Sequence, residues 1–477
     1  MMIEKMEYEE IKKKLKVLTE NPVKGIPEEE MAKARKKLTE SAPKSREIYE
    51  KLKDLIPGGT QHQLVIKDPF AITMKRNLGT KMWDVDDNEY IDYLMSAGAC
   101  ILGHSYPPLK DELIKVINEL DPNTYWNTEW ELKALKLLTK HVPSVEKITY
   151  FQSGTEADMA ALRIARVFTG NDKIIKFGGS YHGWSDQLMC DIHIPYSGTM
   201  EADGIPRGCY KDVVSVPPAD IGALEEALEK YSQKRAGVAA VLVEPLGAES
   251  GSIPVPPDFN KQIRELCDKY DVLLIFDEVV TGFRMGLGGA QEMFGVKPDL
   301  TVFGKILTHG YPSTGAVGGR ADILNVCTGD VETGGKHAFI GGTIRGNPLS
   351  IAATYWTIKL IEEQNAIEKA AKAGDDLVKK LNDLFEEYER PYFAYNYKSC
   401  IHYETYSPVA MDIRDANNIP KAMFRKKCVD DIATILLSEG VITKYGNRAF
   451  TCMQHTPEEN DKFVNAFEKI LKIIPEY

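Results

Sequence analysis

Three short segments of the chain contain residue types that could perform chemistry together. The first is SGTE at Ser153 to Glu156, which lies between an expected strand, KITYF, and an expected helix. A serine before a helix caps it, a glycine lets a ligand approach the backbone, and the free N–H groups at the helix start attract anions. Ser153, Gly154 and Thr155 therefore predict a phosphate cradle. An ordinary helix cap is the alternative interpretation.

The second segment ends in Asp277. It follows the apolar run VLLIF, which predicts a buried strand with the carboxylate at its carboxyl end. A buried carboxylate without a partner costs several kcal/mol, so Asp277 needs a metal, an arginine or a protonated heterocyclic nitrogen beside it. A purely structural ion pair with Arg284 is the alternative.

The third segment contains Lys305, which follows the expected strand LTVFG. A lysine held among apolar neighbours has a more nucleophilic amine, which suits Schiff-base chemistry, whereas an ordinary surface lysine is the alternative. An anion cradle, a carboxylate and an imine-forming amine are together what pyridoxal 5'-phosphate requires of a protein. Tyr181 and His182 are then expected to stack on its ring, and Val279 to pack on the opposite face.

A mainly parallel sheet must position these residues. Between about residues 98 and 312, short β-rich runs alternate with amphipathic helical patterns, which is typical of an α/β fold with helices on both faces of the sheet. Ligands of such sheets lie beyond the carboxyl ends of the strands. We expect a charged helical arm at 1–54, a segment at 55–97 that packs with the small domain, a large domain at 98–345 and a smaller C-terminal α/β domain at 346–477.

Composition excludes several classes of function. The 70 acidic and 59 basic residues give a net charge of -11, with no basic tract for nucleic acid. The apolar runs are far shorter than the ~20 residues that span a bilayer, and the amino terminus has no apolar signal core. Eight cysteines without a CxxC pair indicate neither a disulfide scaffold nor a zinc site. We expect a cytoplasmic protein without nucleic-acid, membrane or metal partners.

Four segments carry a resemblance to a known family: FDEVVTGFRMGLGGAQEMFGVKPDLTVFGKI, NDKIIKFGGSYHG, SGTEADMAALRIAR and GGTIRGNPLSIAA. They resemble class III aminotransferases of fold type I, within which the glutamate-1-semialdehyde 2,1-aminomutase subgroup is most similar. The resemblance extends from about Leu55 to the C-terminus. It implies a pyridoxal-phosphate-dependent transferase with a large domain and a smaller one, which works as a homodimer with shared active sites.

The resemblance also implies a role for each site residue. Lys305 would form the Schiff base and shuttle the proton, while Asp277 would pair with the pyridine nitrogen. Gly154 and Thr155 would bind the phosphate, and Tyr181 would stack on the ring. Two further roles come only from the resemblance: Glu244 among the hydrogen-bonding groups around the ring, and Thr343 at the phosphate of the neighbouring subunit's cofactor.

Two departures from the aminomutase pattern bear on the substrate. The run PGGTQHQLVIK has Gln61, His62 and Gln63 where the pattern has a Ser and an Arg for the substrate carboxylate. The run KYGNRAFTCMQHT has Asn447 and Arg448 near the position at which the aminomutase pattern has a Glu in its active-site loop. Neither Gln nor His replaces a bidentate Arg without loss of affinity. These departures favour an intermolecular aminotransferase.

The expected substrates follow from the absence of the arginine that would bind the substrate carboxylate. The amine donor would be a β- or ω-amino compound with a distant or masked acid, for example a thioester such as 3-aminobutanoyl-CoA. The acceptor would be a keto acid such as 2-oxoglutarate or pyruvate. Two alternatives remain, an intramolecular aminomutase and a non-catalytic protein that binds a phosphate-bearing ligand.

Overall fold

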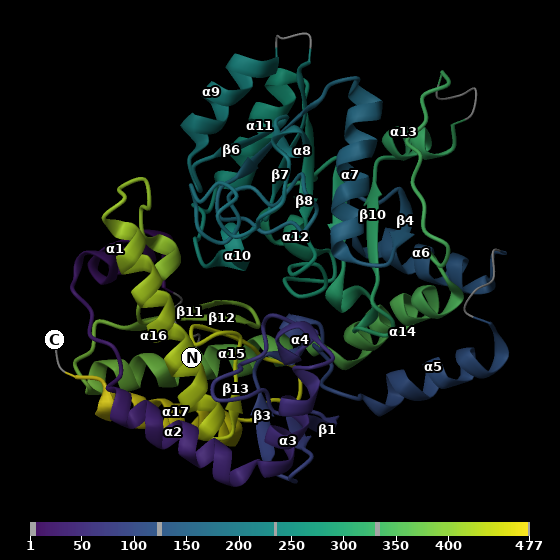
Figure 1. Ribbon diagram of the computed structural model, residues 1–477. Coiled ribbons are helices and arrows are strands. Elements are labelled where there is room, and N and C mark those ends of the chain that lie inside the picture. Colours follow the sequence, from purple (N-terminus) through teal and green to yellow (C-terminus); the bar gives the residue numbers. More distant parts are fainter. Residues whose placement is uncertain (1–5, 122–125, 233–235, 330–333, 476–477) are drawn as a thin grey trace. The chain divides into compact units, whose positions relative to one another are not determined.

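The computed structural model describes residues 6–121, 126–232, 236–329 and 334–475, and the chain divides into two units (Figure 1). One comprises Met1–Tyr106, Ala366–Met411 and Asp415–Tyr477, and the other Pro107–Asn365 and Asp412–Arg414. They are called the terminal unit and the central unit below.

The central unit is built on a seven-stranded sheet with the order β4-β10-β9-β8-β7-β5-β6. The five strands from β9 to β6 are parallel, whereas β10 runs antiparallel to both of its neighbours. The strands are β4 (Lys147–Phe151), β5 (Lys173–Phe177), β6 (Val213–Val216), β7 (Val238–Val243), β8 (Leu273–Asp277), β9 (Leu300–Phe303) and β10 (Gly315–Gly319). The expected α/β fold with a mainly parallel sheet is confirmed.

Helices cover both faces of this sheet because successive strand residues point to opposite sides. Ile275 belongs to a core with α7, whereas its neighbour Leu274 belongs to a second core with α9 and α11 (Figure 1). The helices of the unit are α5 (Pro107–Glu119), α6 (Glu129–His141), α7 (Gly154–Thr169), α8 (Arg207–Tyr210), α9 (Ile221–Ser232), α10 (Ala248–Gly251), α11 (Phe259–Tyr270), α12 (Gly289–Phe294), α13 (Ala321–Leu324) and α14 (Pro348–Gln364). A 3-10 turn, η2, spans Lys305–Thr308.

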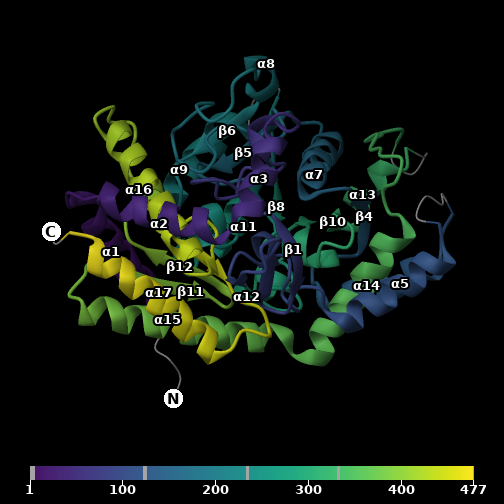
Figure 2. The ribbon, with the colours of Figure 1, turned by 60° about the horizontal axis from the view of Figure 1, so that its bottom comes forward.

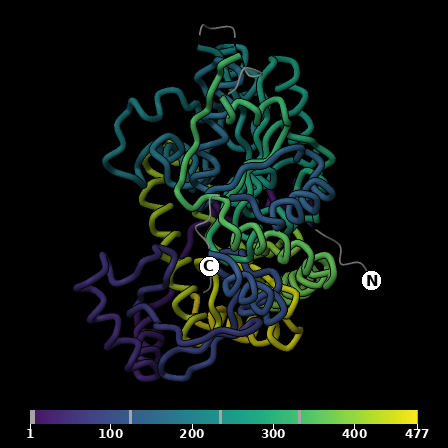
Figure 3. The backbone as a smooth tube through the Cα atoms, turned by 90° about the vertical axis from the view of Figure 1, so that its right-hand side faces the viewer, coloured from purple at the N-terminus to yellow at the C-terminus, as the bar shows by residue number. Residues whose placement is uncertain are grey.

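The terminal unit combines both ends of the chain. Its sheets have the orders β1-β2-β3-β13 and β11-β12-β14, and β13 pairs in parallel with β3 although the two are far apart in sequence. The strands are β1 (Met74–Leu78), β2 (Lys81–Asp84), β3 (Glu89–Asp92), β11 (Phe393–Tyr397), β12 (Cys400–Glu404), β13 (Val441–Ile442) and β14 (Arg448–Phe450). In Figure 3 the purple N-terminal and yellow C-terminal segments accordingly share one unit.

The expected N-terminal arm is part of this unit's core. Ile11, Leu15 and Met31 are buried in one cluster with residues of α15, α16 and α17, and α2 packs on α16 (Figure 2). The helices are α1 (Tyr8–Glu20), α2 (Glu28–Ser41), α3 (Pro43–Leu52), α4 (Met95–Gly98), α15 (Ala366–Glu387), α16 (Asn418–Ser438) and α17 (Pro457–Ile473).

The division between the units lies after α14, later than the boundary expected at 345. The reason is that α14 packs on α5 and α6 of the central unit. Among the described residues, no helix combines the length and the apolar character needed to cross a bilayer.

Candidate active site

Four of the expected site residues, Ser153, Glu244, Asp277 and Lys305, lie at one edge of the central sheet. Because β10 is antiparallel to both β4 and β9, β4 points the same way as the parallel strands. Ser153 therefore follows the carboxyl end of β4 at the edge where Glu244 follows β7, Asp277 ends β8 and Lys305 follows β9. This is the edge at which ligands bind in open α/β sheets.

The N-terminus of α7 forms an anion cradle. Ser153 is the N-cap residue, and its hydroxyl oxygen accepts a hydrogen bond from the Glu156 N–H at 3.2 Å. Gly154 and Thr155 are the first residues of the 16-residue helix, so no preceding turn of the helix accepts hydrogen bonds from their N–H groups. Ser153 is thus both the ordinary cap and part of a site suited to phosphate.

Glycines bring the cradle close to the other strand ends. A Cβ on Gly154 would lie 2.9 Å from Cγ2 of Val279, and one on Gly304 would lie 3.1 Å from Cγ1 of the same valine. Val279 therefore fills the space between the start of α7 and the residue before Lys305. Its expected contact with the cofactor ring stays a prediction.

Gly183, which follows His182, offers a test of the cradle. Its φ is +82°, and an added Cβ would lie 2.4 Å from Thr155 Oγ1 and 2.7 Å from Thr155 Cα. We expect Gly183→Ala to displace Thr155 and to weaken pyridoxal phosphate binding by roughly tenfold or more, since losing one good hydrogen bond to a charged group costs about 1.5–3 kcal/mol. A titration of cofactor binding measures the effect.

Gly170 provides the matched control. It has a similar φ of +71° at the C-cap of α7, but nothing lies within 4 Å of an added Cβ. Gly170→Ala carries the same backbone penalty without the clash, so it should lower the melting temperature while leaving cofactor affinity unchanged. Equal cofactor affinity in the two variants would show that Thr155 does not form the cradle.

Asp277 is buried and has two partners. Its Oδ2 lies 2.7 Å from Nδ1 of His182, and its Oδ1 accepts a hydrogen bond from the Val279 N–H at 3.0 Å. A carboxylate only accepts, so Nδ1 of His182 carries the hydrogen. His182 is thus a partner of Asp277 rather than the ring-stacking group expected. Arg284, the alternative partner, donates from Nε to the Val280 carbonyl.

Lys305 begins η2 in a left-handed conformation, with φ of +44°. Such a backbone is costly for a residue other than glycine and is found where the surrounding structure imposes it, often at functional sites. Desolvation lowers the pKa of Lys305, whereas the charges of Asp277, Glu244 and Glu249 oppose that effect. A lysine with a lowered pKa provides more of the neutral, nucleophilic amine at neutral pH.

Glu244 organises the loops beside Tyr181. Its carboxylate accepts hydrogen bonds from the backbone N–H groups of Tyr181, Glu249 and Ser250, at 2.9, 3.1 and 2.9 Å. Burial raises the pKa of Glu244, and the negative charges of Glu249 and Asp277 raise it further. The ring of Tyr181 stacks on His193 with centroids 5.3 Å apart. Glu244 therefore fixes the backbone from which Tyr181 projects.

Thr343 is an expected site residue that lies apart from the others. It is exposed in a turn, and among the described residues no recorded contact joins it to Ser153, Asp277 or Lys305. Its expected role, at a neighbouring subunit's cofactor, stays a prediction.

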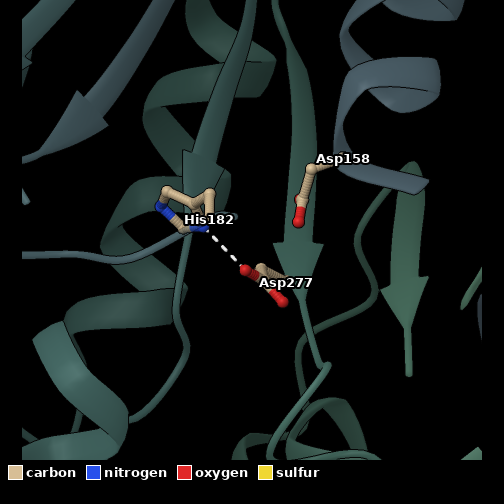
Figure 4. A group of neighbouring side chains, drawn as sticks. All are labelled: Asp158, His182 and Asp277. Carbon is tan, nitrogen blue, oxygen red and sulfur yellow. Dashed lines mark hydrogen bonds and ion pairs between the residues drawn. The ribbon is translucent and has the colours of Figure 1, made fainter. Parts of the chain in front are cut away.

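Asp158 is a member of the site that sequence reasoning missed. Its carboxylate is buried, and one oxygen each of Asp158 and Asp277 and one ring nitrogen of His182 all lie within 4.8 Å of one another (Figure 4). The sequence contains one signal for it. Asp158 precedes the buried Ala161, Leu162 and Ala165 by three, four and seven residues, so it shares their face of α7. An acidic residue on the apolar face of a helix needs a reason to be there.

The three groups are of types that can bind a cation. Burial raises the pKa of Asp158 well above its usual range, and the charge of Asp277 raises it further. A phosphate-bearing aldehyde with a ring nitrogen fits the site better, since the site offers an anion cradle, a carboxylate and an amine. Two buried polar atoms there, Asp158 Oδ1 and His182 Nε2, also have no hydrogen-bond partner in the described part of the chain.

Sequence and structure comparisons relate the chain to known proteins. The family model of class-III aminotransferases matches residues 64–474. A glutamate-1-semialdehyde 2,1-aminomutase from Archaeoglobus fulgidus is 36% identical over 439 residues, which cover 90% of this chain and 99% of the relative.

Two solved structures resemble the chain over nearly its whole length. An ω-transaminase from Sphaerobacter thermophilus has a TM-score of 0.79 at 28% identity and covers 90% of this chain and 97% of its own. A β-phenylalanine aminotransferase from Variovorax paradoxus has a TM-score of 0.80 at 27% identity, and the match covers 93% of this chain and 97% of that protein's chain.

Proposed function

The chain belongs to the class-III aminotransferases, and on that premise we propose that it moves an amino group between a β- or ω-amino compound and a keto acid. It is an enzyme of the fold type I group that depends on pyridoxal phosphate. The observation that carries the proposed chemistry is the meeting of Lys305, Asp277 and the α7 cradle at one edge of the sheet.

Pyridoxal 5'-phosphate, when bound, supplies an aldehyde that forms imines with amines and a pyridinium ring that withdraws electrons from the reacting carbon. We propose that Ser153, Gly154 and Thr155 hold its phosphate and that Asp277 faces its ring nitrogen. Tyr181 and Val279 would contact the two faces of the ring, while Glu244 would keep the Tyr181 segment in place.

Lys305 is proposed to bond the aldehyde and to carry the proton. With the cofactor bound, Lys305 would be the residue that holds its aldehyde, and the Nζ, when neutral, would be the base that takes and carries the proton of the carbon that bears the amine. The lowered pKa of Lys305 favours this, because a lysine with its ordinary pKa would remain protonated at neutral pH.

Asp277 is proposed to hold a proton on the ring nitrogen. An opposite charge within hydrogen-bond reach can raise the pKa of such a nitrogen by one unit or more. His182 and the Val279 N–H orient the carboxylate by contacting one oxygen each.

The proposal for the amine donor rests on charge. Glu249 is buried, and its negative charge acts on Lys305. A substrate carboxylate close to the reacting carbon would be repelled there. The positive charge of the buried Arg284 also acts on Lys305, but in sequence Gln61, His62 and Gln63 stand where the aminomutase pattern has its Ser and Arg for the substrate carboxylate. A donor with a distant acid, or with the acid masked as a thioester such as 3-aminobutanoyl-CoA, avoids this cost, and 2-oxoglutarate or pyruvate would accept the amino group.

We also propose a homodimer, in which Thr343 of each chain reaches the phosphate site of the other. The exposure of Thr343 supports this, because an exposed side chain is accessible to a second chain.

The second candidate function is an intramolecular aminomutase. The 36% identity to the Archaeoglobus fulgidus aminomutase over 90% of the chain favours it. An aminomutase needs no external keto acid, so this requirement separates the two candidates. The non-catalytic alternative is dropped, since the chain belongs to a family of enzymes.

The deciding experiment supplies the cofactor-loaded enzyme with amine donors, each with and without 2-oxoglutarate or pyruvate. The donors are a 3-aminobutanoyl thioester, free β-amino acids and ω-amines, and glutamate 1-semialdehyde is assayed alone. We expect turnover of a β- or ω-amino donor only when a keto acid is present. Turnover of the semialdehyde alone, without any acceptor-dependent reaction, would establish the aminomutase instead.

A further inference from the structure

The Asp158 side chain is unusual among the buried groups of the site. It is 1% exposed, it projects from the first turns of α7, and its Oδ1 has no hydrogen-bond partner among the described residues. In Figure 4 its carboxyl group points toward Asp277 from the neighbouring helix. The mechanism proposed above gives it no role.

Charged and titratable groups surround Asp158 from several elements. Asp277 on β8 and Glu244 after β7 are negative, Lys305 on η2 is positive, and His182 lies in the loop after β5. Two carboxylates within 4.8 Å in a buried site cannot both remain ionised without large cost. One of the pair must therefore hold a proton.

The hydrogen-bond donors around Asp158 and Asp277 decide which of these two carboxyl groups is neutral. Asp277 has two donors, the His182 ring nitrogen and the Val279 N–H, and these stabilise a carboxylate. Asp158 Oδ1, by contrast, has no hydrogen-bond donor among the described residues. Burial and the charge of Asp277 also raise the pKa of Asp158 well above its usual range.

We propose that Asp158 is a positioning residue that stays a neutral carboxylic acid and donates its hydrogen toward Asp277, directly or through one water. A separation of up to 4.8 Å is spanned by one bridging water. The pair then carries a single negative charge, located on Asp277, where the ring nitrogen is expected. This inference rests on the proposed function only for its effect on the cofactor, and not for the protonation of Asp158.

The protonation is tested first in cofactor-free protein by infrared difference spectroscopy between wild type and Asp158→Asn at pH 7 to 8. We expect the difference to contain the C=O stretch of a protonated carboxylic acid. Subtraction is needed because burial also raises the pKa of Glu278 and Glu244. A difference spectrum with carboxylate bands alone would overturn the proposal, and this result is independent of whether the enzyme is an aminotransferase.

The effect on the site is tested in the cofactor-loaded enzyme through the pH at which its visible absorbance changes. Asp158→Asn keeps a neutral donor of the same shape and should leave this pH unchanged. Asp158→Leu removes the donor and should shift it upward by about one unit, because the charge on Asp277 then acts more strongly on the cofactor-bound lysine.

Two outcomes would contradict the proposal. A downward shift in Asp158→Asn would mean that a negative charge had been removed, so that Asp158 is ionised. If the pH of the absorbance change were unchanged in both variants and only the melting temperature fell, Asp158 would have a purely structural role. Absence of any coloured adduct in wild type would refute the proposed function instead and leave the infrared result standing.

Discussion

Lys305→Ala is expected to lower kcat by about four orders of magnitude or more, the largest effect of any substitution in the chain. The variant loses both the amine that bonds the cofactor aldehyde and the base that moves the proton. The cradle at Ser153 and the carboxylate of Asp277 are unchanged, so the cofactor should still bind, without a covalent link. Steady-state kinetics measures the loss, and added methylamine should restore part of the rate by replacing the missing base.

Lys297→Ala is the control. Lys297 is an exposed lysine that forms a weak surface ion pair with Glu146 at 3.8 Å. Its replacement should leave kcat unchanged. After borohydride reduction, mass analysis should find the cofactor on Lys305 in wild type. A reduced adduct on another lysine, or turnover of Lys305→Ala within tenfold of wild type, would remove the basis of the proposed chemistry.

The elements that carry the expected site were predictable because their local patterns are strong. The run KITYF matches β4, and VLLIFD contains β8, since short runs of apolar and β-branched residues that end at polar residues are typical of strands. Once the strands are known, the topology of an α/β sheet dictates that their carboxyl ends meet.

Strand β10 was not predicted, because GAVGG has neither alternation nor high β-propensity. Its glycines are explained only by contacts made after folding. A Cβ on Gly315 would lie 2.1 Å from the Ser153 carbonyl oxygen, so the strand can pass the cradle only without a side chain there. A sequence pattern records local preference and contains no direct measure of such close approach.

The roles of His182 and Asp158 were missed for a related reason. His182 and Asp277 are 95 positions apart, and their 2.7 Å contact depends on how the loop after β5 folds back over the strand ends. An aromatic residue near a ring site suggests stacking, and only the geometry shows that the imidazole instead bonds the carboxylate. The sequence does show that Asp158 lies on the buried face of α7, but not which group it faces.

Asp277→Asn is expected to lower kcat by about three orders of magnitude while the protein stays folded. The amide keeps the shape of the side chain, so packing is preserved, but its single oxygen can accept from His182 Nδ1 or from the Val279 N–H and not from both. It carries no charge, however, and cannot hold a proton on the ring nitrogen, so the ring withdraws electrons less effectively when the substrate carbon loses its proton. Asp277→Glu, which keeps the charge, should recover part of the rate.

The same substitution has a second effect that needs no turnover. The charge of Asp277 is the largest of the influences that raise the pKa of Lys305, so its removal should lower that pKa further. The pH dependence of Lys305 acylation in cofactor-free enzyme measures this, with a shift to lower pH expected. Asp271→Asn is the matched control, because Asp271 is exposed just before β8 with φ of +53°, a conformation that asparagine tolerates. If Asp277→Asn kept full activity, or if Asp271→Asn shifted the acylation profile equally, the carboxylate at the end of β8 could not be the partner of the ring nitrogen.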